Sequence, residues 1–162
     1  MGPYNILVVD DEASNLSALR RILRHEYNVF TATNGEDALA IMKQNDIAII
    51  VADYRMPGMT GIELLEKARQ KYPDTIRIIL TAYTDEETIN AGQIYGYVTK
   101  PWEPEEIRAI VREGIEAYEV TCVSKEPHTR VLLHSGIITR EQLEAALHAQ
   151  RAEEKPLGEI LV

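Results

Sequence analysis

Five short apolar runs, each followed by a stretch whose apolar residues recur at helical spacing, constrain the fold of this sequence more than any other feature. The third run, residues 47–52, is apolar on both of its alternating faces, as a central strand covered by helices on both sides must be. Repeated units of this kind predict an α/β fold, a doubly wound parallel sheet of five strands with right-handed crossovers and five flanking helices. A short helical extension is expected at the carboxyl end.

The same patterns locate the individual elements. Strands are expected at residues 6–9, 29–32, 47–52, 76–80 and 95–99. Helices are expected at 14–23, at 36–43, after Thr60, after Thr84, and over a stripe of Ile107, Ile110, Val111, Ile115 and Tyr118. Thr60-x-x-Glu63 and Thr84-x-x-Glu87 have the spacing of a capping box, which marks the start of a helix.

Polar residues that could take part in catalysis or ligand binding follow the expected strands. Asp10 and Asp11 follow the first strand, and Asp53 ends the third. Thr81 ends the fourth strand, and Lys100 follows the fifth. Ligands of such sheets bind beyond the carboxyl ends of the strands, where the strand order reverses. These five side chains, separated in the sequence, are therefore expected to meet at one edge of the sheet.

This set of residue types favours phosphoryl chemistry. Three clustered carboxylates repel one another unless a cation is present, and Mg²⁺ takes hard oxygen ligands of this kind. A carboxylate such as Asp53 can attack phosphorus and form an acyl phosphate. Mg²⁺, the Lys100 ammonium and the Thr81 hydroxyl could then each neutralise or bind one phosphoryl oxygen.

These residues resemble the signature of response regulator receiver domains, the CheY-like domains of two-component signalling and phosphorelays. The motifs are Asp10-Asp11, Asp53-x-x-Met-Pro-Gly58, Thr81-Ala82 and Lys100-Pro101, and the match covers about residues 4–118. The resemblance implies a flavodoxin-like sheet of order 2-1-3-4-5. It also implies that a sensor histidine kinase or phosphotransfer protein donates a phosphoryl group to Asp53, and that the domain catalyses this transfer and a slow dephosphorylation without being an enzyme for other substrates.

The resemblance further implies roles for individual residues. Asp11, Asp53 and the backbone carbonyl of Arg55 would hold Mg²⁺, with Asp10 acting directly or through water, and the Lys100-Pro101 peptide would be cis. Tyr97 would swing inward as Thr81 moves to the phosphoryl group, although a tyrosine in a strand is often a plain packing residue. The face formed by the helix after Thr84, the strand at 95–99 and the helix with the stripe from Ile107 to Tyr118 would then change shape for a downstream protein, an output domain or a second copy of the chain.

Two large side chains are expected to tune the lifetime of the phosphoryl group. Arg55 lies two residues after Asp53, and Tyr83 lies two residues after Thr81. Both should flank the path of the hydrolytic water, and we expect them to screen the acyl phosphate.

Charge and composition narrow the setting. The net charge of −9 opposes nucleic-acid binding, which needs a cationic face. Cys122 is the single cysteine, so no intrachain disulfide can form, and a reducing, cytoplasmic setting fits. No apolar run is long enough to span a bilayer, and the sequence predicts neither a membrane anchor nor a leader.

The pattern changes after Tyr118. We expect a receiver at residues 1–119, a linker at 120–129 and a partial helical domain or truncated output module at 130–162. The tail helix is expected to follow the capping box Thr139-x-x-Gln142 and to end near Glu154. Its apolar side carries Leu143, Ala146, Leu147 and Gln150.

This tail resembles part of the N-terminal domain of type II secretion and pilus ATPases, the MshEN-like module that binds cyclic di-GMP in some relatives. The matching residues are Leu132, Gly136, Leu143, Leu147, Gln150 and Leu157-Gly158. The module's opening Arg-Leu-Gly corresponds here to residues 127–129, Pro-His-Thr. The tail is therefore either a cyclic di-GMP sensor or a helical packing or dimerisation element.

Two enzyme classes fit the sequence less well. A haloacid-dehalogenase-like phosphatase also uses an aspartate nucleophile with Mg²⁺, but it needs a second aspartate two residues later, where Arg55 stands. A dinucleotide enzyme would carry Gly-x-Gly-x-x-Gly after the first strand, and this sequence does not.

Overall fold

The structure is a computed structural model that describes residues 4–82, 94–124 and 135–153. The chain divides into two compact units, Met1–Gly114 and Ile115–Val162. The described elements, in chain order, are β1 (Asn5–Val9), α1 (Ala13–Leu23), β2 (Asn28–Ala32), α2 (Gly35–Gln44), β3 (Ile49–Asp53), α3 (Gly61–Lys71), β4 (Ile76–Thr81), β5 (Gly96–Thr99), α5 (Pro104–Ser124) and α7 (Arg140–Glu153).

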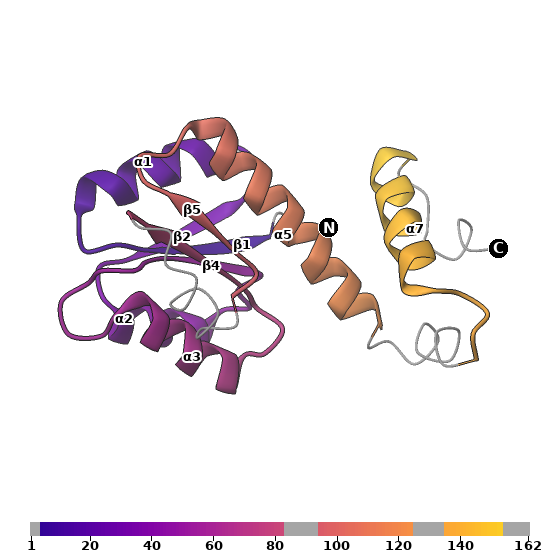
Figure 1. Ribbon diagram of the computed structural model, residues 1–162, viewed down its shortest axis with the longest axis horizontal. Helices are drawn as coiled ribbons and strands as arrows, with labels where there is room; N and C mark the ends of the chain where they lie inside the picture. The colour runs from indigo at the N-terminus through magenta and orange to yellow at the C-terminus, as the bar shows by residue number, and fades with distance from the viewer. Residues whose placement is uncertain (1–3, 83–93, 125–134, 154–162) are drawn as a thin grey trace. The chain divides into compact units, whose positions relative to one another are not determined.

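The first unit contains a five-stranded sheet of order β2-β1-β3-β4-β5 (Figure 1). Every neighbouring pair of strands is parallel, so the predicted fold class and strand order are confirmed. The central strand β3 is buried along its whole length, as its two-sided apolar pattern requires. It begins at Ile49 rather than at residue 47, and it extends to include Asp53.

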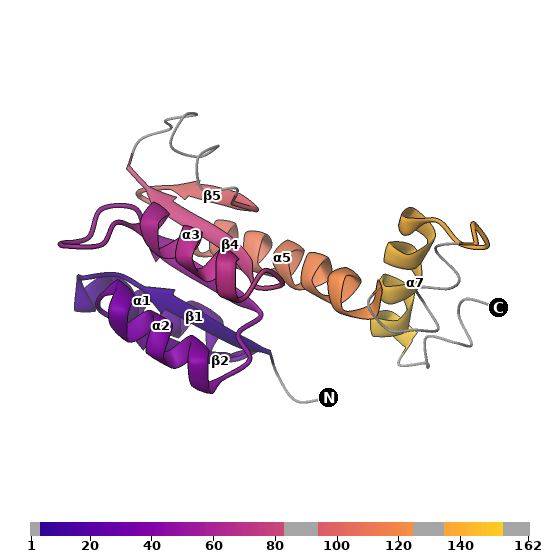
Figure 2. The same cartoon turned by 90° about the horizontal axis from the view of Figure 1, so that it is seen from below.

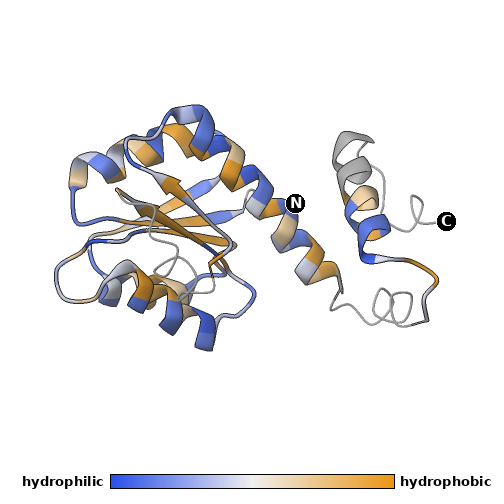
Figure 3. Cartoon of the chain, in the orientation of Figure 1, coloured by the Kyte–Doolittle hydropathy of each residue, from blue (hydrophilic) through white to orange (hydrophobic). Residues whose placement is uncertain are grey.

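Helices cover both faces of the sheet. Helices α2 and α3 lie on one face, and α1 and the first part of α5 lie on the other (Figures 1 and 2). Alternate strand residues Leu7, Ile50 and Ile79 pack with Leu64 and Leu65 of α3 in one apolar cluster. Figure 3 shows the hydrophobic residues gathered on the strands and on the helix faces turned toward them.

Side-chain caps fix the starts of two helices on the α2–α3 face. The Thr60 hydroxyl accepts a hydrogen bond from the Glu63 backbone N–H at 3.2 Å, so α3 begins where its capping-box spacing predicted. Asn34 caps α2 by accepting from the Asp37 N–H at 2.8 Å. The expected capping box at residues 84–87, and the helix after it, lie outside the described residues.

Helix α5 is longer than the sequence pattern predicted. Residues 120–124 belong to the linker predicted at 120–129 but are helical in the structure. The extension has a packing reason, because Val120 is buried and forms a small apolar cluster within the second unit. The other members of this cluster are Val123, Ile138, Leu143 and Leu147.

The second helix of this unit follows its sequence signals closely. Thr139 and Gln142 exchange two hydrogen bonds, Thr139 N–H to Gln142 Oε1 at 2.8 Å and Gln142 N–H to Thr139 Oγ1 at 3.1 Å. This reciprocal capping box starts α7, which ends at Glu153, one residue before the expected end. Within the described parts of the chain, no helix is both long enough and apolar enough to cross a membrane.

Candidate functional site

The carboxyl ends of four parallel strands bring the candidate residues to one edge of the sheet. Asp10 directly follows β1, and Asp53 is the last residue of the neighbouring strand β3. Thr81 ends β4, and Lys100 follows β5, in which Thr99 is paired with Thr81. The strand order reverses between β1 and β3, so the two aspartates lie at the position where such sheets bind ligands.

Three carboxylates gather at this edge. Asp10, Asp11 and Asp53 can each direct one carboxylate oxygen so that all three oxygens lie within 4.8 Å of one another. Asp10 is completely buried and Asp53 is 6% exposed, whereas Asp11 is exposed to solvent. The cluster therefore has a buried floor and one open side from which a cation could enter.

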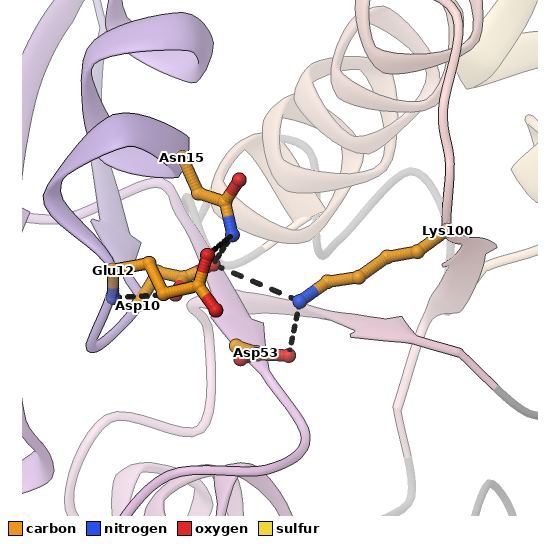
Figure 4. A network of polar contacts seen from close by, with 5 residues as sticks. All are labelled: Asp10, Glu12, Asn15, Asp53 and Lys100. Atoms are coloured by element: carbon orange, nitrogen blue, oxygen red, sulfur yellow. Dashed lines mark hydrogen bonds and ion pairs between the residues drawn. The ribbon is translucent and has the colours of Figure 1, made fainter.

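The Lys100 side chain extends toward Asp10 and Asp53 from beyond the end of β5 (Figure 4). Its Nζ lies 2.8 Å from Asp53 Oδ1 and 3.9 Å from Asp10 Oδ2. The Lys100 backbone N–H donates to the Thr81 carbonyl oxygen at 2.8 Å, which ties the end of β5 to the end of β4. The Lys100-Pro101 peptide is cis, as the resemblance implied.

Asp10 is held by donors on both of its oxygens. The Glu12 backbone N–H donates to Oδ1 at 2.9 Å, and Asn15 Nδ2 donates to Oδ2 at 3.0 Å (Figure 4). Burial raises the pKa of Asp10 above its ordinary value of 3.8, and the nearby charge of Asp53 raises it further. The hydrogen bonds from Glu12 and Asn15 and the charge of Lys100 oppose this rise.

The raised pKa of Asp10 predicts how stability depends on pH without divalent cations. The folded state binds this proton more tightly than the unfolded state, so Asp10 costs stability as the pH rises from the ordinary aspartate range through the raised pKa. Asp10→Asn is therefore expected to unfold at a higher urea concentration than the wild type at about pH 7, and to lose this advantage at about pH 4. Parallel pH profiles for the two proteins in urea unfolding would contradict the assignment.

Gly61, the first residue of α3, packs directly against the backbone of Asp53. A Cβ atom at this position would overlap the Asp53 carbonyl oxygen and would lie 2.8 Å from Ile79 Cδ1. The Gly61 N–H donates to the Tyr54 carbonyl oxygen at 2.9 Å. The absence of a side chain at Gly61 thus lets α3 approach the strand end that carries Asp53.

The remaining predicted residues occupy different environments. Thr81 is buried at the strand end, and Arg55 is exposed in the loop after β3. The Tyr97 side chain is 42% exposed on β5. Tyr83, predicted to flank the acyl phosphate, lies outside the described residues.

Sequence reasoning missed Asn15 and Gly61. Asn15 could have been found from its position, because it is a polar residue next to the apolar helix face of Leu16 and Leu19 and five residues after Asp10. Gly61 stands directly after a helix-capping threonine, where a glycine has no capping function of its own.

The donor set fits Mg²⁺. Carboxylate oxygens are the ligands that this ion prefers in proteins, and the exposed side at Asp11 leaves room for the waters that it retains. Beside the cluster, Asn15, Lys100, Pro101 and Trp102 line a cavity of about 380 Å³.

Comparison with known proteins covers the part of the chain that contains this site. The family described as "Response regulator receiver domain" matches residues 6–112. The hydrogenase transcriptional regulatory protein HoxA of Cupriavidus necator is 41% identical over 116 residues, which make up 69% of this chain and 24% of that protein. HoxA of Bradyrhizobium diazoefficiens is matched over 29% of its length, so the chain spans about a quarter of these curated relatives.

Two solved structures show the same fold. A chain described as adenylate cyclase from Rhodopirellula baltica has a TM-score of 0.72 at 35% identity, with 77% of this chain and 96% of that chain covered. The chemotaxis protein CheY4 of Vibrio cholerae has a TM-score of 0.67 at 29% identity, with 69% and 98% covered.

Proposed function

The chain belongs to the family of response regulator receiver domains, the phosphoacceptor switches of two-component signalling, and from this premise we propose that Asp53 is its phosphoacceptor. One observation carries the proposal. Asp53 lies buried at the carboxyl end of the central strand, with the Lys100 ammonium 2.8 Å away and two further carboxylates close by. This arrangement gives a nucleophile, a counter-charge and a cation site at a single point.

The phosphoryl transfer uses groups of this chain. An Asp53 carboxylate oxygen attacks phosphorus, the phosphorus–nitrogen bond of the donor's phosphohistidine breaks, and the imidazole leaves with the electron pair. Asp11, Asp53 and the Arg55 carbonyl would hold Mg²⁺, with Asp10 acting directly or through water. The bound ion supplies charge neutralisation at a phosphoryl oxygen.

Lys100 has two successive partners in this scheme. Before transfer its ammonium is paired with Asp53 and lies near Asp10. After transfer the carboxyl group is part of a neutral acyl linkage and the negative charge lies on the phosphoryl oxygens, so the ammonium moves to one of them. The Thr81 hydroxyl binds another phosphoryl oxygen, and this movement of Thr81 is the first step of the switch.

The surface beside β5 is the part of the domain whose change of shape a downstream partner would recognise. Tyr97 is exposed there and lines a groove of about 390 Å³ between β5 and α5. Glu106 and Glu113 also line this groove, which gives it a negative rim. We assign Tyr97 the role of the aromatic residue that turns inward as Thr81 moves, changing this surface for a downstream protein or output domain. The helix expected before β5 lies outside the described residues.

Arg55 is proposed to set the lifetime of the acyl phosphate. It is exposed two residues after Asp53, where its side chain can screen the phosphoryl group from water. Arg55→Ala is expected to shorten the dephosphorylation half-life several-fold, on the scale of about 1 kcal/mol in the barrier. The half-life is measured by intact mass after removal of the phosphodonor, and an unchanged value would refute this role. Tyr83→Ala tests the companion prediction in the same assay.

Phosphorylation by a small-molecule donor tests the central proposal. We expect the wild type, incubated with acetyl phosphate and Mg²⁺, to gain the mass of one phosphoryl group, and the adduct to map to the peptide containing Asp53. Omitting Mg²⁺ should abolish the gain. A wild type that forms no adduct, or forms it elsewhere, would overturn the proposal.

The kinase partner and the output domain are inferred from the receiver family and from relatives, and not from residues of this chain. A histidine kinase partner and an output domain follow from the receiver family. HoxA is named a transcriptional regulator, so a DNA-directed output enters as a proposal alongside the protein-directed one, although the net charge of −9 opposes nucleic-acid contact by this chain itself. Cyclic di-GMP binding by the tail stays a prediction, because residues 127–129 lie outside the described parts.

A further inference from the structure

The Asp10 carboxylate is buried between two other carboxylates and the Lys100 ammonium. It is completely buried, it lies within reach of two other carboxylates, and its Oδ2 lies 3.9 Å from the Lys100 ammonium. In the proposed function this ammonium leaves for the phosphoryl group. The Glu12 backbone N–H still holds Oδ1, but Oδ2 then depends on a different partner, because a buried carboxylate oxygen without a nearby donor or positive charge is costly.

Asn15, in the first turn of α1, supplies this second hydrogen-bond donor to Asp10. Its Nδ2 donates to Asp10 Oδ2 at 3.0 Å, the same oxygen that lies nearest Lys100. The amide is anchored in turn, since Nδ2 also lies 3.4 Å from Glu12 Oε2 (Figure 4). Leu16 and Leu19, the buried residues that follow it, fix α1 against the sheet. The donor therefore comes from a rigid element and not from a free loop.

We propose that Asn15 is a positioning residue for the cation site, whose amide holds the Asp10 carboxylate while Lys100 moves from the carboxylates to the incoming phosphoryl group. This inference rests on the proposed function. A neutral donor suits the task, because it orients the carboxylate without adding a positive charge that would compete with Mg²⁺. Such outer hydrogen bonds fix the geometry of ligating groups and affect metal affinity strongly.

The fluorescence of a tryptophan beside the site can report Mg²⁺ binding. Trp102 is the single tryptophan of the chain and lines the same cavity as Asn15 and Lys100. Titration of the unphosphorylated protein with Mg²⁺ can therefore be followed by Trp102 fluorescence. The rise in thermal unfolding temperature with Mg²⁺ gives a second readout that does not depend on the tryptophan.

Asn15→Leu keeps the approximate size of the side chain and removes the donor. We expect its Mg²⁺ half-saturation to be about tenfold weaker than that of the wild type. Asn15→Gln retains the amide on a longer arm and should recover at least half of the lost affinity on a logarithmic scale. Ser17→Leu, at an exposed position of the same helix, should bind Mg²⁺ like the wild type.

The outcomes separate this inference from the proposed function. If Asn15→Leu binds Mg²⁺ as the wild type does, or if Asn15→Gln loses as much affinity as Asn15→Leu, the positioning role is refuted. A loss of stability without Mg²⁺ and no change in affinity would likewise reduce Asn15 to a packing residue. A wild type that binds Mg²⁺ but never forms the adduct would refute the proposed function and leave the effect of Asn15 on Mg²⁺ affinity intact.

Discussion

Asp53→Asn is expected to form no phospho-adduct with acetyl phosphate and Mg²⁺ under conditions in which the wild type is modified. The carboxamide lacks the anionic oxygen that attacks phosphorus, and no other described carboxylate is both paired with Lys100 at 2.8 Å and located at the end of a central strand. The loss should be complete within the sensitivity of intact mass spectrometry.

The fold of this variant should survive. Asparagine keeps the shape of the side chain and an oxygen that can accept a hydrogen bond from Lys100, and it removes one of three mutually repelling carboxylates. Asp46→Asn, the same exchange at an exposed position, serves as the matched control and should be phosphorylated like the wild type. An adduct of normal yield on Asp53→Asn would show that another residue is the acceptor.

Gly61→Ala is expected to destabilise the first unit by about 3 kcal/mol or more, measured as a shift of the urea midpoint at an unchanged slope. The new methyl group would overlap the Asp53 carbonyl oxygen, and a backbone atom in a buried central strand cannot yield cheaply. The gain of up to about 1 kcal/mol from replacing glycine in a helix is too small to offset this. Relief of the clash would displace Asp53 and weaken Mg²⁺ binding as well.

Gly114→Ala is the matched control for this effect. Gly114 is also a buried helical glycine, but its added Cβ would meet Ile49 Cδ1 at 2.9 Å, the flexible end of a side chain. We expect its stability to lie within about 1 kcal/mol of the wild type, because the helix gain and the small displacement of Ile49 oppose each other. Equal losses in the two variants would mean that contact with the Asp53 backbone is not the decisive feature.

The sequence predicted those parts of the structure that depend on periodicity and on strand ends. Strand β3 could be recognised because it is apolar on both faces, and Asp53 because it directly follows that apolar run. Parallel strands then bring Asp10, Asp53 and Lys100 to the same edge, which is a matter of topology rather than of side-chain detail. Capping boxes located α3 and α7 for the same local reason.

Features that depend on contacts between elements could not be predicted in this way. The hydrogen bond from Asn15 to Asp10 requires knowing how closely α1 approaches the end of β1. The role of Gly61 depends on the distance between α3 and the Asp53 backbone. Helix α5 extends beyond Tyr118 because Val120 packs with residues from 138 onward, which an analysis of the helix stripe alone does not include.

The pairing of Lys100 with the aspartate cluster has a consequence for charge balance. Three ionised carboxylates and one ammonium leave two negative charges at the sheet edge, which is the charge that a single divalent cation cancels. In the proposed function, conversion of Asp53 to an acyl phosphate would add about one further negative charge at this edge of the sheet. Neutral donors such as the Thr81 hydroxyl would then be drawn toward the added charge. In the proposed function, this added charge would couple phosphorylation of Asp53 to movement of the protein.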